Sequence, residues 1–316
     1  MSGKYTVISL FAGAGGSLLG YKLAGFKELL AIEWNSICIN TLKLNYSNLN
    51  IWKKDIRNVK GKDILKYLNI DIGELDILDG SPPCQGFSLA GKRKIDDKRN
   101  DLVRENIRLI NEIQPKVFII ENVKGMIVGK MKILFKQYLK ELKQLNYNVE
   151  VALLNAKYYN VPQSRERLIF MGVRKDLNLK PIFPKPSNNI IIVLEALKDV
   201  NNKTYGPELT KLYKYYWNKT KPGKALGKFL TYKKINPLKV SPTIVKGNPL
   251  YHWSKCRYLT IEEAKRLQTF PDDYKFYGNY KQQWEQIGNS VPPLLMKAIA
   301  ECIKTNILDK YYAKTA

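Results

Sequence analysis

Apolar residues in the first 175 positions fall into short continuous runs that alternate with stretches of helical spacing. Runs typical of buried strands cover Tyr5–Phe11, Glu28–Glu33, Asp76–Asp79, Val117–Ile120, Val149–Leu154 and Leu168–Val173. Helical spacing covers Ser17–Leu23, Leu102–Ile113 and Ile133–Leu145, and Asn35 stands where it could cap another helix. Strands that alternate with helices predict an α/β fold, a doubly wound and mostly parallel sheet with helices on both faces.

This pattern fades after Pro181–Pro186. Residues Phe183–Cys256 contain 14 lysines against 3 acidic residues, with tyrosines and tryptophans interspersed. Helical spacing returns in Thr260–Gln268 and in Leu294–Ile307. We therefore predict a large domain formed by residues 1–182 and 276–316, and a small, loop-rich, basic domain formed by residues 183–275.

The charge balance narrows the class of partner. Lys and Arg total 53 against 28 Asp and Glu, so the formal net charge is +25. Excess charge of this size opposes compaction unless a polyanion neutralises it, which favours nucleic acid, with an acidic membrane surface as the alternative. The abundance of Lys beside Asn, Ile and Tyr also fits an AT-rich genome, which would account for part of the excess without any partner.

Other features of the sequence exclude several classes. No apolar run reaches the roughly 18–20 residues of a membrane span, and Met1–Leu10 lacks a signal-peptide core, so we expect a soluble, cytoplasmic protein. The four cysteines are far apart, which argues against structural zinc and against a disulfide framework. The single histidine, His252, excludes mechanisms that need two. We therefore expect no metal site.

A glycine-rich segment, Phe11–Gly16, joins the first predicted strand to the first predicted helix. Glycine lets the backbone approach a ligand closely, and a helix N-terminus presents free N–H groups. Glu33 ends the next strand, 20 residues after Gly13, where a carboxylate can accept hydrogen bonds from ribose hydroxyls. Trp34 could stack on adenine and Asp55 could bind its amino group, although each also suits a structural position. This pattern fits a nicotinamide dinucleotide, a flavin or S-adenosylmethionine.

The segment Gly80–Ser88 (GSPPCQGFS) is more specific. Cys84 follows two prolines at the end of a predicted buried strand, a stiff and exposed position that suits a reactive thiol. Glu121 follows the strand Val117–Ile120, so we expect a thiol and a carboxyl group at the same edge of the sheet. Such a pair can perform nucleophilic chemistry without histidine.

Two further segments add polar groups. Arg165 and Arg167 are two residues apart and precede a strand, so both are predicted on one face, where they could fix a cysteine loop, a base carbonyl or a phosphate. Gln286–Pro293 (QIGNSVPP) predicts a sharply turned segment.

In combination, these segments resemble the cytosine-5 DNA methyltransferase family, particularly its short prokaryotic members. The matching segments, in chain order, are Phe11–Gly16, Glu33–Trp34, Asp55–Ile56, Pro82–Gln85, Glu121–Val123, Gln163–Arg167, Arg257–Pro271 and Gly288–Pro292. The resemblance implies an S-adenosylmethionine-dependent methyltransferase (Rossmann-like) fold with a small target-recognition domain. It also implies methyl transfer from S-adenosylmethionine to carbon 5 of a cytosine in DNA. Ser81 and Asn100 stand where family members often carry glycine, which bears on loop dynamics.

The resemblance also implies roles for individual residues. Cys84 would be the nucleophile, Glu121 would contact the cytosine, and Arg165 would support both. The expected cofactor-binding residues are Phe11, Gly13, Gly15, Glu33, Trp34, Asp55, Ile56, Pro83, Leu102, Asn289 and Val291. The expected DNA-binding residues are Gln85, Ser88, Arg93, Lys94, Arg99, Arg167 and Arg257.

The expected partner is double-stranded DNA, from which the target cytosine must be flipped because C6 is inaccessible in a stacked duplex. We expect a monomer, accompanied in some settings by a separately encoded restriction endonuclease. A transfer-RNA methyltransferase of the same family is one alternative, but the Cys-Phe-Thr tripeptide typical of that branch is absent. A nicotinamide-dependent oxidoreductase is another, and it leaves Cys84, Glu121 and the basic domain unexplained. A third alternative is a DNA-binding relative without catalytic activity, but such a protein would not need the side chains of Cys84 and Glu121.

Overall fold

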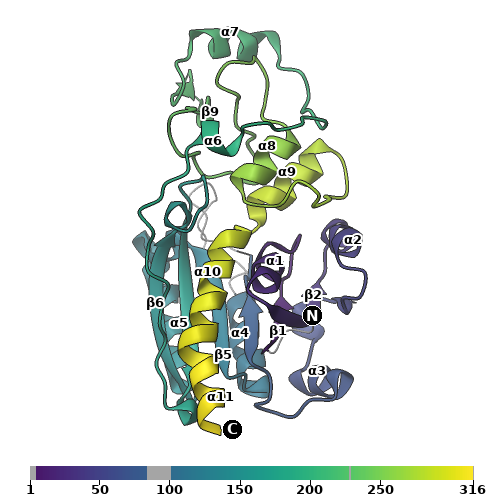
Figure 1. Cartoon of the computed structure of the whole chain (residues 1–316), viewed down its shortest axis with the longest axis vertical. Coiled ribbons are helices and arrows are strands. Elements are labelled where there is room, and N and C mark those ends of the chain that lie inside the picture. The colour runs from purple at the N-terminus through teal and green to yellow at the C-terminus, as the bar shows by residue number, and fades with distance from the viewer. Residues whose placement is uncertain (1–4, 84–100, 228, 316) are drawn as a thin grey trace.

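One sheet organises the larger lobe of the molecule, and the computed structural model describes residues 5–83, 101–227 and 229–315. Its strands are β1 (Tyr5–Leu10), β2 (Phe26–Glu33), β3 (Ile51–Lys53), β4 (Ile77–Gly80), β5 (Val117–Val123), β6 (Tyr147–Asn155) and β7 (Glu166–Arg174). They lie in the order β3-β2-β1-β4-β5-β7-β6, and all neighbouring pairs are parallel except the two that include β7. The predicted α/β fold with a mostly parallel sheet is confirmed (Figure 1).

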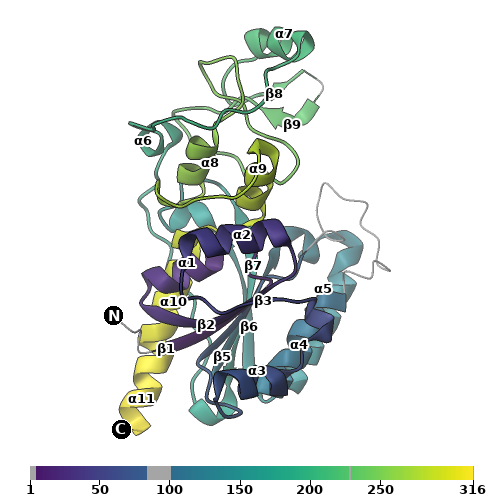
Figure 2. The same cartoon turned by 90° about the vertical axis from the view of Figure 1, so that its right-hand side faces the viewer.

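Helices cover both faces of this sheet (Figure 2). One face carries α1 (Gly16–Leu23) and α10 (Pro293–Ile303), and the other carries α3 (Gly61–Leu68), α4 (Asp101–Ile113) and α5 (Lys132–Gln144). Each face buries its own apolar core against these helices. The remaining helices of this lobe are α2 (Ser36–Asn45), the π-helical Lys304–Leu308 and α11 (Asp309–Thr315). Short 3-10 turns cover Ile56–Asn58, Lys124–Ile127, Gly129–Met131, Ala156–Tyr158 and Lys175–Leu177.

The strand order reverses between β1 and β4. From β1 the chain builds β2 and β3 on one side, and it then crosses to β4 on the other side. Ligand sites in open α/β sheets lie beyond the carboxyl ends of the strands at such a reversal. The glycine-rich segment leaves β1 at this point, and the chain that leads to Cys84 leaves β4 there.

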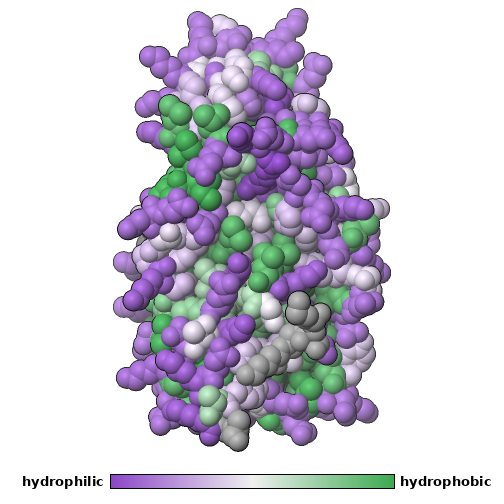
Figure 3. Space-filling model, viewed as in Figure 1, coloured by the Kyte–Doolittle hydropathy of each residue, from purple (hydrophilic) through white to green (hydrophobic). Residues whose placement is uncertain are grey.

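The smaller lobe has little regular structure, as its sequence predicts. It carries α6 (Val193–Ala196), α7 (Lys211–Lys219), and the two-stranded sheet of β8 (Ala225–Leu226) and β9 (Phe229–Lys233). In Figure 1, α7 stands at the end of the molecule opposite to α11. Hydrophilic side chains cover much of the face drawn in Figure 3, including the rim of this lobe.

Two helices, α8 (Ile261–Leu267) and α9 (Tyr280–Asn289), lie between the lobes (Figure 1). A third apolar core joins Ala14 of the larger lobe to Ile244, Leu267 and Trp284. This core includes residues from both sides of the predicted boundary at 275–276, so α8 and α9 pack as one unit across it.

The structure corrects three details of the predicted elements. Strand β5 continues through Glu121 to Val123, so this carboxylate belongs to the strand and does not follow it. Strand β3 and helix α3 were not predicted. Gln286 lies in the last turn of α9, a helix that begins with a reciprocal capping box between Asn279 and Gln282, and the sharp turn comes only at Ser290.

Candidate active site

The glycine-rich segment turns through the left-handed region of backbone space three times. Phe11 has φ 53°, Gly13 has φ 54° and Gly15 has φ 84°, and Gly15 caps helix α1. Gly16 has a different constraint, because a Cβ atom there would lie 2.3 Å from the carbonyl oxygen of Val291. The segment therefore folds tightly against the turn that follows α9.

We expect Gly16→Ala to lower the free energy of unfolding by about 1–3 kcal/mol, because the added methyl group has to displace the Val291 backbone. Gly247→Ala is the matched control, since a Cβ atom at Gly247 meets no heavy atom within 4 Å. Urea unfolding measures both variants. Equal midpoints for Gly16→Ala and Gly247→Ala would contradict the close packing at Gly16.

Glu33, the last residue of β2, secures this segment. Its carboxylate is 7% exposed and accepts hydrogen bonds from the backbone N–H groups of Gly13 (2.8 Å), Trp34 (2.9 Å) and Asn35 (2.8 Å). Burial raises the pKa of Glu33, and these three donors lower it. A carboxylate offers about four acceptor sites, so acceptor capacity remains for a ribose hydroxyl.

The neighbouring groups suit an adenosine ligand. Trp34 is 69% exposed, which leaves an aromatic ring free for stacking beside the glycine-rich segment. Asp55 follows β3, but its carboxylate caps the Ile56–Asn58 turn and forms an ion pair with Arg57. The structure therefore gives Asp55 a structural partner in addition to any ligand. The chemistry of this donor set fits S-adenosylmethionine.

Other expected cofactor-binding residues lie around the same strand ends. Val291 is buried against Gly16, and Asn289 beside it is exposed. Pro83, three residues after the end of β4, is exposed. Leu102, at the start of α4, is half-buried.

Glu121 lies on β5, next to the strand that leads to Cys84. Gly80 of β4 pairs with Ile120, so Glu121 stands one residue nearer the carboxyl edge than Gly80. The Glu121 side chain is buried and forms an ion pair with Arg167, whose Nε lies 2.6 Å from Oε1. Cys84 itself lies outside the described residues, as do the expected DNA contacts Gln85, Ser88, Arg93, Lys94 and Arg99.

The two arginines of the Gln-x-Arg-x-Arg segment have different surroundings. Arg165 is 1% exposed and donates to the carbonyl oxygens of Ile244 (2.9 Å), Gly288 (3.0 Å) and Ser290 (2.9 Å). Arg167 contacts Glu121, and its expected contact with DNA stays a prediction. The prediction gave Arg165 the supporting role beside Glu121, and the structure brings Arg167 to that carboxylate. Arg165 precedes β7. Its hydrogen bonds tie the larger lobe to the small lobe and to the turn that follows α9.

Several buried polar atoms around this edge have no hydrogen-bond partner within the described part of the chain. They are Ser81 Oγ, Asn106 Nδ2, Asn122 Nδ2, Arg165 Nε and Arg167 Nε, the last of which has an ionic contact with Glu121 without hydrogen-bond geometry. Buried polar groups without partners are rare in folded proteins, and they call for a ligand, a water molecule or another chain segment. Asn106 lies directly against Gly80, so two of these atoms border the start of the Cys84 segment. The sequence gave no signal for Asn106.

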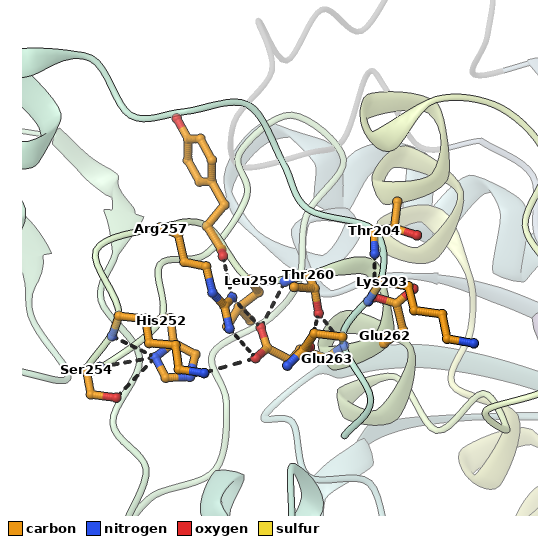
Figure 4. Close-up of polar contacts among 12 residues, drawn as sticks. Lys203, Thr204, His252, Ser254, Arg257, Leu259, Thr260, Glu262 and Glu263 are labelled. Carbon is orange, nitrogen blue, oxygen red and sulfur yellow. Dashed lines mark hydrogen bonds and ion pairs between the residues drawn. The ribbon is translucent and has the colours of Figure 1, made fainter. Parts of the chain in front are cut away.

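Arg257, another expected DNA contact, has its guanidinium committed within the protein (Figure 4). Its Nη atoms form two bonds of 2.8 and 2.7 Å with the Glu263 carboxylate, which also closes the capping box of α8 with Thr260. Such a bidentate pair fixes the loop before α8. Burial lowers the pKa of His252 to about 4, and its ring stacks on Trp253. His252 thus packs within the small lobe, and we assign Arg257 to stabilising the same lobe.

None of the helices in the described ranges is long and apolar enough to cross a membrane. The described side chains of His, Cys, Asp and Glu nowhere form a group of three or more that could hold a metal ion.

Comparison with known proteins identifies the family. A family model described as C-5 cytosine-specific DNA methylase matches residues 5–305. The Type II methyltransferase M.PspPI of Psychrobacter sp. is 38% identical over 96% of this chain and 79% of its own length. The Type II methyltransferase M.XorII of Xanthomonas oryzae pv. oryzae is 32% identical over 92% of this chain and 82% of its own length.

Solved structures agree with this assignment. The crystal structure of a proposed DNA modification methyltransferase encoded within a prophage (E. coli) superimposes with a TM-score of 0.84 at 25% identity, and the match covers 97% of this chain and 100% of that chain. Since the family model spans the sheet, the site at its carboxyl edge and the small lobe, the chain belongs to the C-5 cytosine-specific DNA methylase family and is a DNA (cytosine-5-)-methyltransferase that uses S-adenosylmethionine.

Proposed function

We propose that this enzyme methylates a flipped-out cytosine within a specific duplex DNA sequence, through a covalent bond between Cys84 and C6 of the base. The observation that carries this proposal is the position of Glu121. Its buried carboxylate lies on β5 at the carboxyl edge, beside β4, the strand whose continuation holds Cys84. A nucleophile and an acid are thus supplied by neighbouring strands, as the chemistry requires.

In the proposed reaction, the Cys84 thiolate adds to C6 and pushes electron density toward C5 and N3. The protonated carboxyl group of Glu121 donates a hydrogen bond to N3 and accepts one from the 4-amino group, and so stabilises this density. S-adenosylmethionine, when bound, supplies the methyl group that C5 takes. Loss of the C5 proton, to water, restores the double bond and expels Cys84. No step needs a metal ion or His252.

Arg167 has the role of holding the Glu121 carboxyl group in place. The ion pair between them is buried on both sides, with side-chain exposures of 11% each. In such surroundings a guanidinium restricts the carboxylate to one position before the base arrives. We assign Arg165, in turn, to the joint between the lobes, on the basis of its three carbonyl contacts.

For the cofactor, we propose that Glu33 and Trp34 hold the adenosine, while the turn from Phe11 to Gly16 and the segment around Val291 enclose the rest. The orientation of Glu33 by three backbone donors supports this assignment. Asp55 and Ile56 would contact the adenine ring.

We propose that residues 183–275 read the DNA sequence. Lysines of this region would contact phosphates, which position the protein without specifying bases. Expression in a methylation-free host, followed by bisulfite sequencing of the host DNA, tests the function as a whole. Conversion-resistant cytosines confined to one short motif are expected. Fully converted DNA together with methylated transfer RNA would instead support the RNA-directed alternative.

We expect DNA binding to weaken steeply with salt, because Lys-rich surfaces release counterions that were condensed on DNA. Residues 183–256 alone carry 14 lysines against 3 acidic residues. Each phosphate contact contributes about −0.9 to the slope of log affinity against log salt. Fluorescence anisotropy with a duplex oligonucleotide from 50 to 300 mM salt measures the slope. A slope near zero would assign the charge excess to base composition of the genome.

As its Type II methyltransferase relatives suggest, the enzyme would belong to a restriction–modification system. We propose that it acts as a monomer in the cytoplasm, beside a separately encoded endonuclease.

A further inference from the structure

A buried carboxyl group on β4 contacts helix α1, which begins at the end of the glycine-rich segment. Asp79, the residue before the end of β4, is 2% exposed and pairs in register with Ser9 of β1. The Tyr21 hydroxyl donates a hydrogen bond to it at 3.2 Å, and the Ser17 hydroxyl donates another. Both donors belong to α1, the helix that begins at Gly16. Asp79 is therefore attached to the element that faces the cofactor.

Within the described residues, this carboxyl group has no counter-ion. No Lys or Arg within the described ranges forms an ion pair with Asp79. The titratable groups that face it are Tyr21 on α1, Glu28 on β2 and Glu121 on β5, and none of them carries positive charge. Ser9 Oγ is also buried on this side of the sheet, beside Glu28.

An anion buried in this way costs free energy that a nearby positive charge would recover. Burial, reinforced by the Glu121 charge, raises the pKa of Asp79 to about 7. The group therefore exchanges a proton near neutral pH, and a cation beside it would shift the equilibrium toward the ionised form.

S-adenosylmethionine carries a sulfonium charge that S-adenosylhomocysteine, the product, lacks. We propose that Asp79 is the counter-charge for this sulfonium, so that the enzyme binds the cationic cofactor in preference to its neutral product. The inference rests on the proposed position of the cofactor at the glycine-rich segment. In this role Asp79 would help to position the cofactor and to distinguish it from the product, and it would take no part in making or breaking bonds.

The proposal predicts linkage between cofactor binding and proton release. Because the sulfonium favours ionised Asp79, binding of S-adenosylmethionine at pH 7 should expel up to about half a proton more than binding of S-adenosylhomocysteine, as a pKa of about 7 allows. Affinity for S-adenosylmethionine should consequently rise relative to the product between pH 6 and pH 8. The ammonium group common to both ligands contributes equally and cancels in the comparison.

Isothermal titration calorimetry of the full chain, with each ligand in two buffers of different ionisation enthalpy, measures the released protons. The comparison between ligands in the wild-type enzyme needs no variant. In Asp79→Asn, which keeps the shape and an acceptor for Tyr21, the difference in proton release should vanish. Affinity for S-adenosylmethionine should fall about tenfold, the order expected when one charge–charge attraction inside a protein is lost. Affinity for S-adenosylhomocysteine should stay within about twofold.

Glu28→Gln is the matched control. Glu28 pairs with Val7, two residues farther from the carboxyl edge than Ser9, and burial raises its pKa well above the ordinary value. Because Glu28 lies farther from the edge at which the cofactor is proposed to bind, an amide there should leave the ligand preference unchanged.

Equal proton release for both ligands in the wild-type enzyme would overturn the inference while leaving the proposed function intact. An Asp79→Asn variant that keeps the wild-type preference for S-adenosylmethionine would do the same. If the wild-type enzyme bound neither ligand, the proposed cofactor site would fall, and this inference with it.

Discussion

The Cys84→Ala variant should form no denaturant-stable complex with DNA that carries 5-fluorocytosine at the target position, whereas the wild-type enzyme should form one when S-adenosylmethionine is present. Fluorine replaces the hydrogen that must leave C5 before the thiolate is expelled, so the adduct accumulates. Without the thiolate, C5 stays a poor nucleophile, and methyl transfer to ordinary DNA should fall by roughly 10⁴–10⁶-fold, the range seen when a covalent nucleophile is removed.

A denaturing gel with labelled DNA detects the complex, and transfer of a labelled methyl group gives the rate. Cys256→Ala is the matched control, because Cys256 is an exposed free cysteine in the small lobe. It should trap DNA as the wild-type enzyme does. A stable complex formed by Cys84→Ala would remove this residue from the mechanism.

Glu121→Gln should slow the chemical step by about 10²–10⁴-fold, the range typical of a positioned acid. The amide keeps the shape of the side chain and can donate one hydrogen bond, so binding of DNA and cofactor should change little. It also loses the ion pair with Arg167, which frees the guanidinium beside the base.

Single-turnover methyl transfer with saturating DNA separates this step from product release. Glu166→Gln is the control, since it removes the charge from a neighbouring but exposed pair with Lys124. The control should retain the wild-type rate. An unchanged rate in Glu121→Gln would make this carboxylate structural and would require another source of the proton.

The sequence predicted the elements that position the site because each carries a strong local signal. Glycine-rich and proline-rich segments mark the ends of β1 and β4, and continuous apolar runs mark the strands themselves. The edge at which Cys84 and Glu121 are expected follows from strand–helix alternation alone. The irregular small lobe was also predicted, since residues 183–256 lack periodicity. Strand β3 is only three residues long, which is too short for a periodic signal.

Side-chain partners were harder to predict, because they depend on contacts between segments far apart in the sequence. Arg165 and Arg167 look equivalent in the sequence. The distinction between them comes from the pairing of β7 with β5 and from carbonyl groups about 80 to 125 positions away. In the sequence, Arg257 resembles a surface cation. In the structure, both of its Nη atoms donate hydrogen bonds to the Glu263 carboxylate. Asp79 carried no motif, and only its burial singles it out.

The contacts of Arg165 have an evolutionary consequence. All three acceptors are main-chain carbonyl groups, which every amino acid possesses, so the hydrogen bond from Arg165 to the small lobe does not depend on the side chain at position 244. The small lobe can therefore exchange its side chains, and with them the DNA target that we propose it reads, while the anchor that holds it beside the larger lobe stays the same. Diversification of specificity is thereby uncoupled from maintenance of the catalytic lobe.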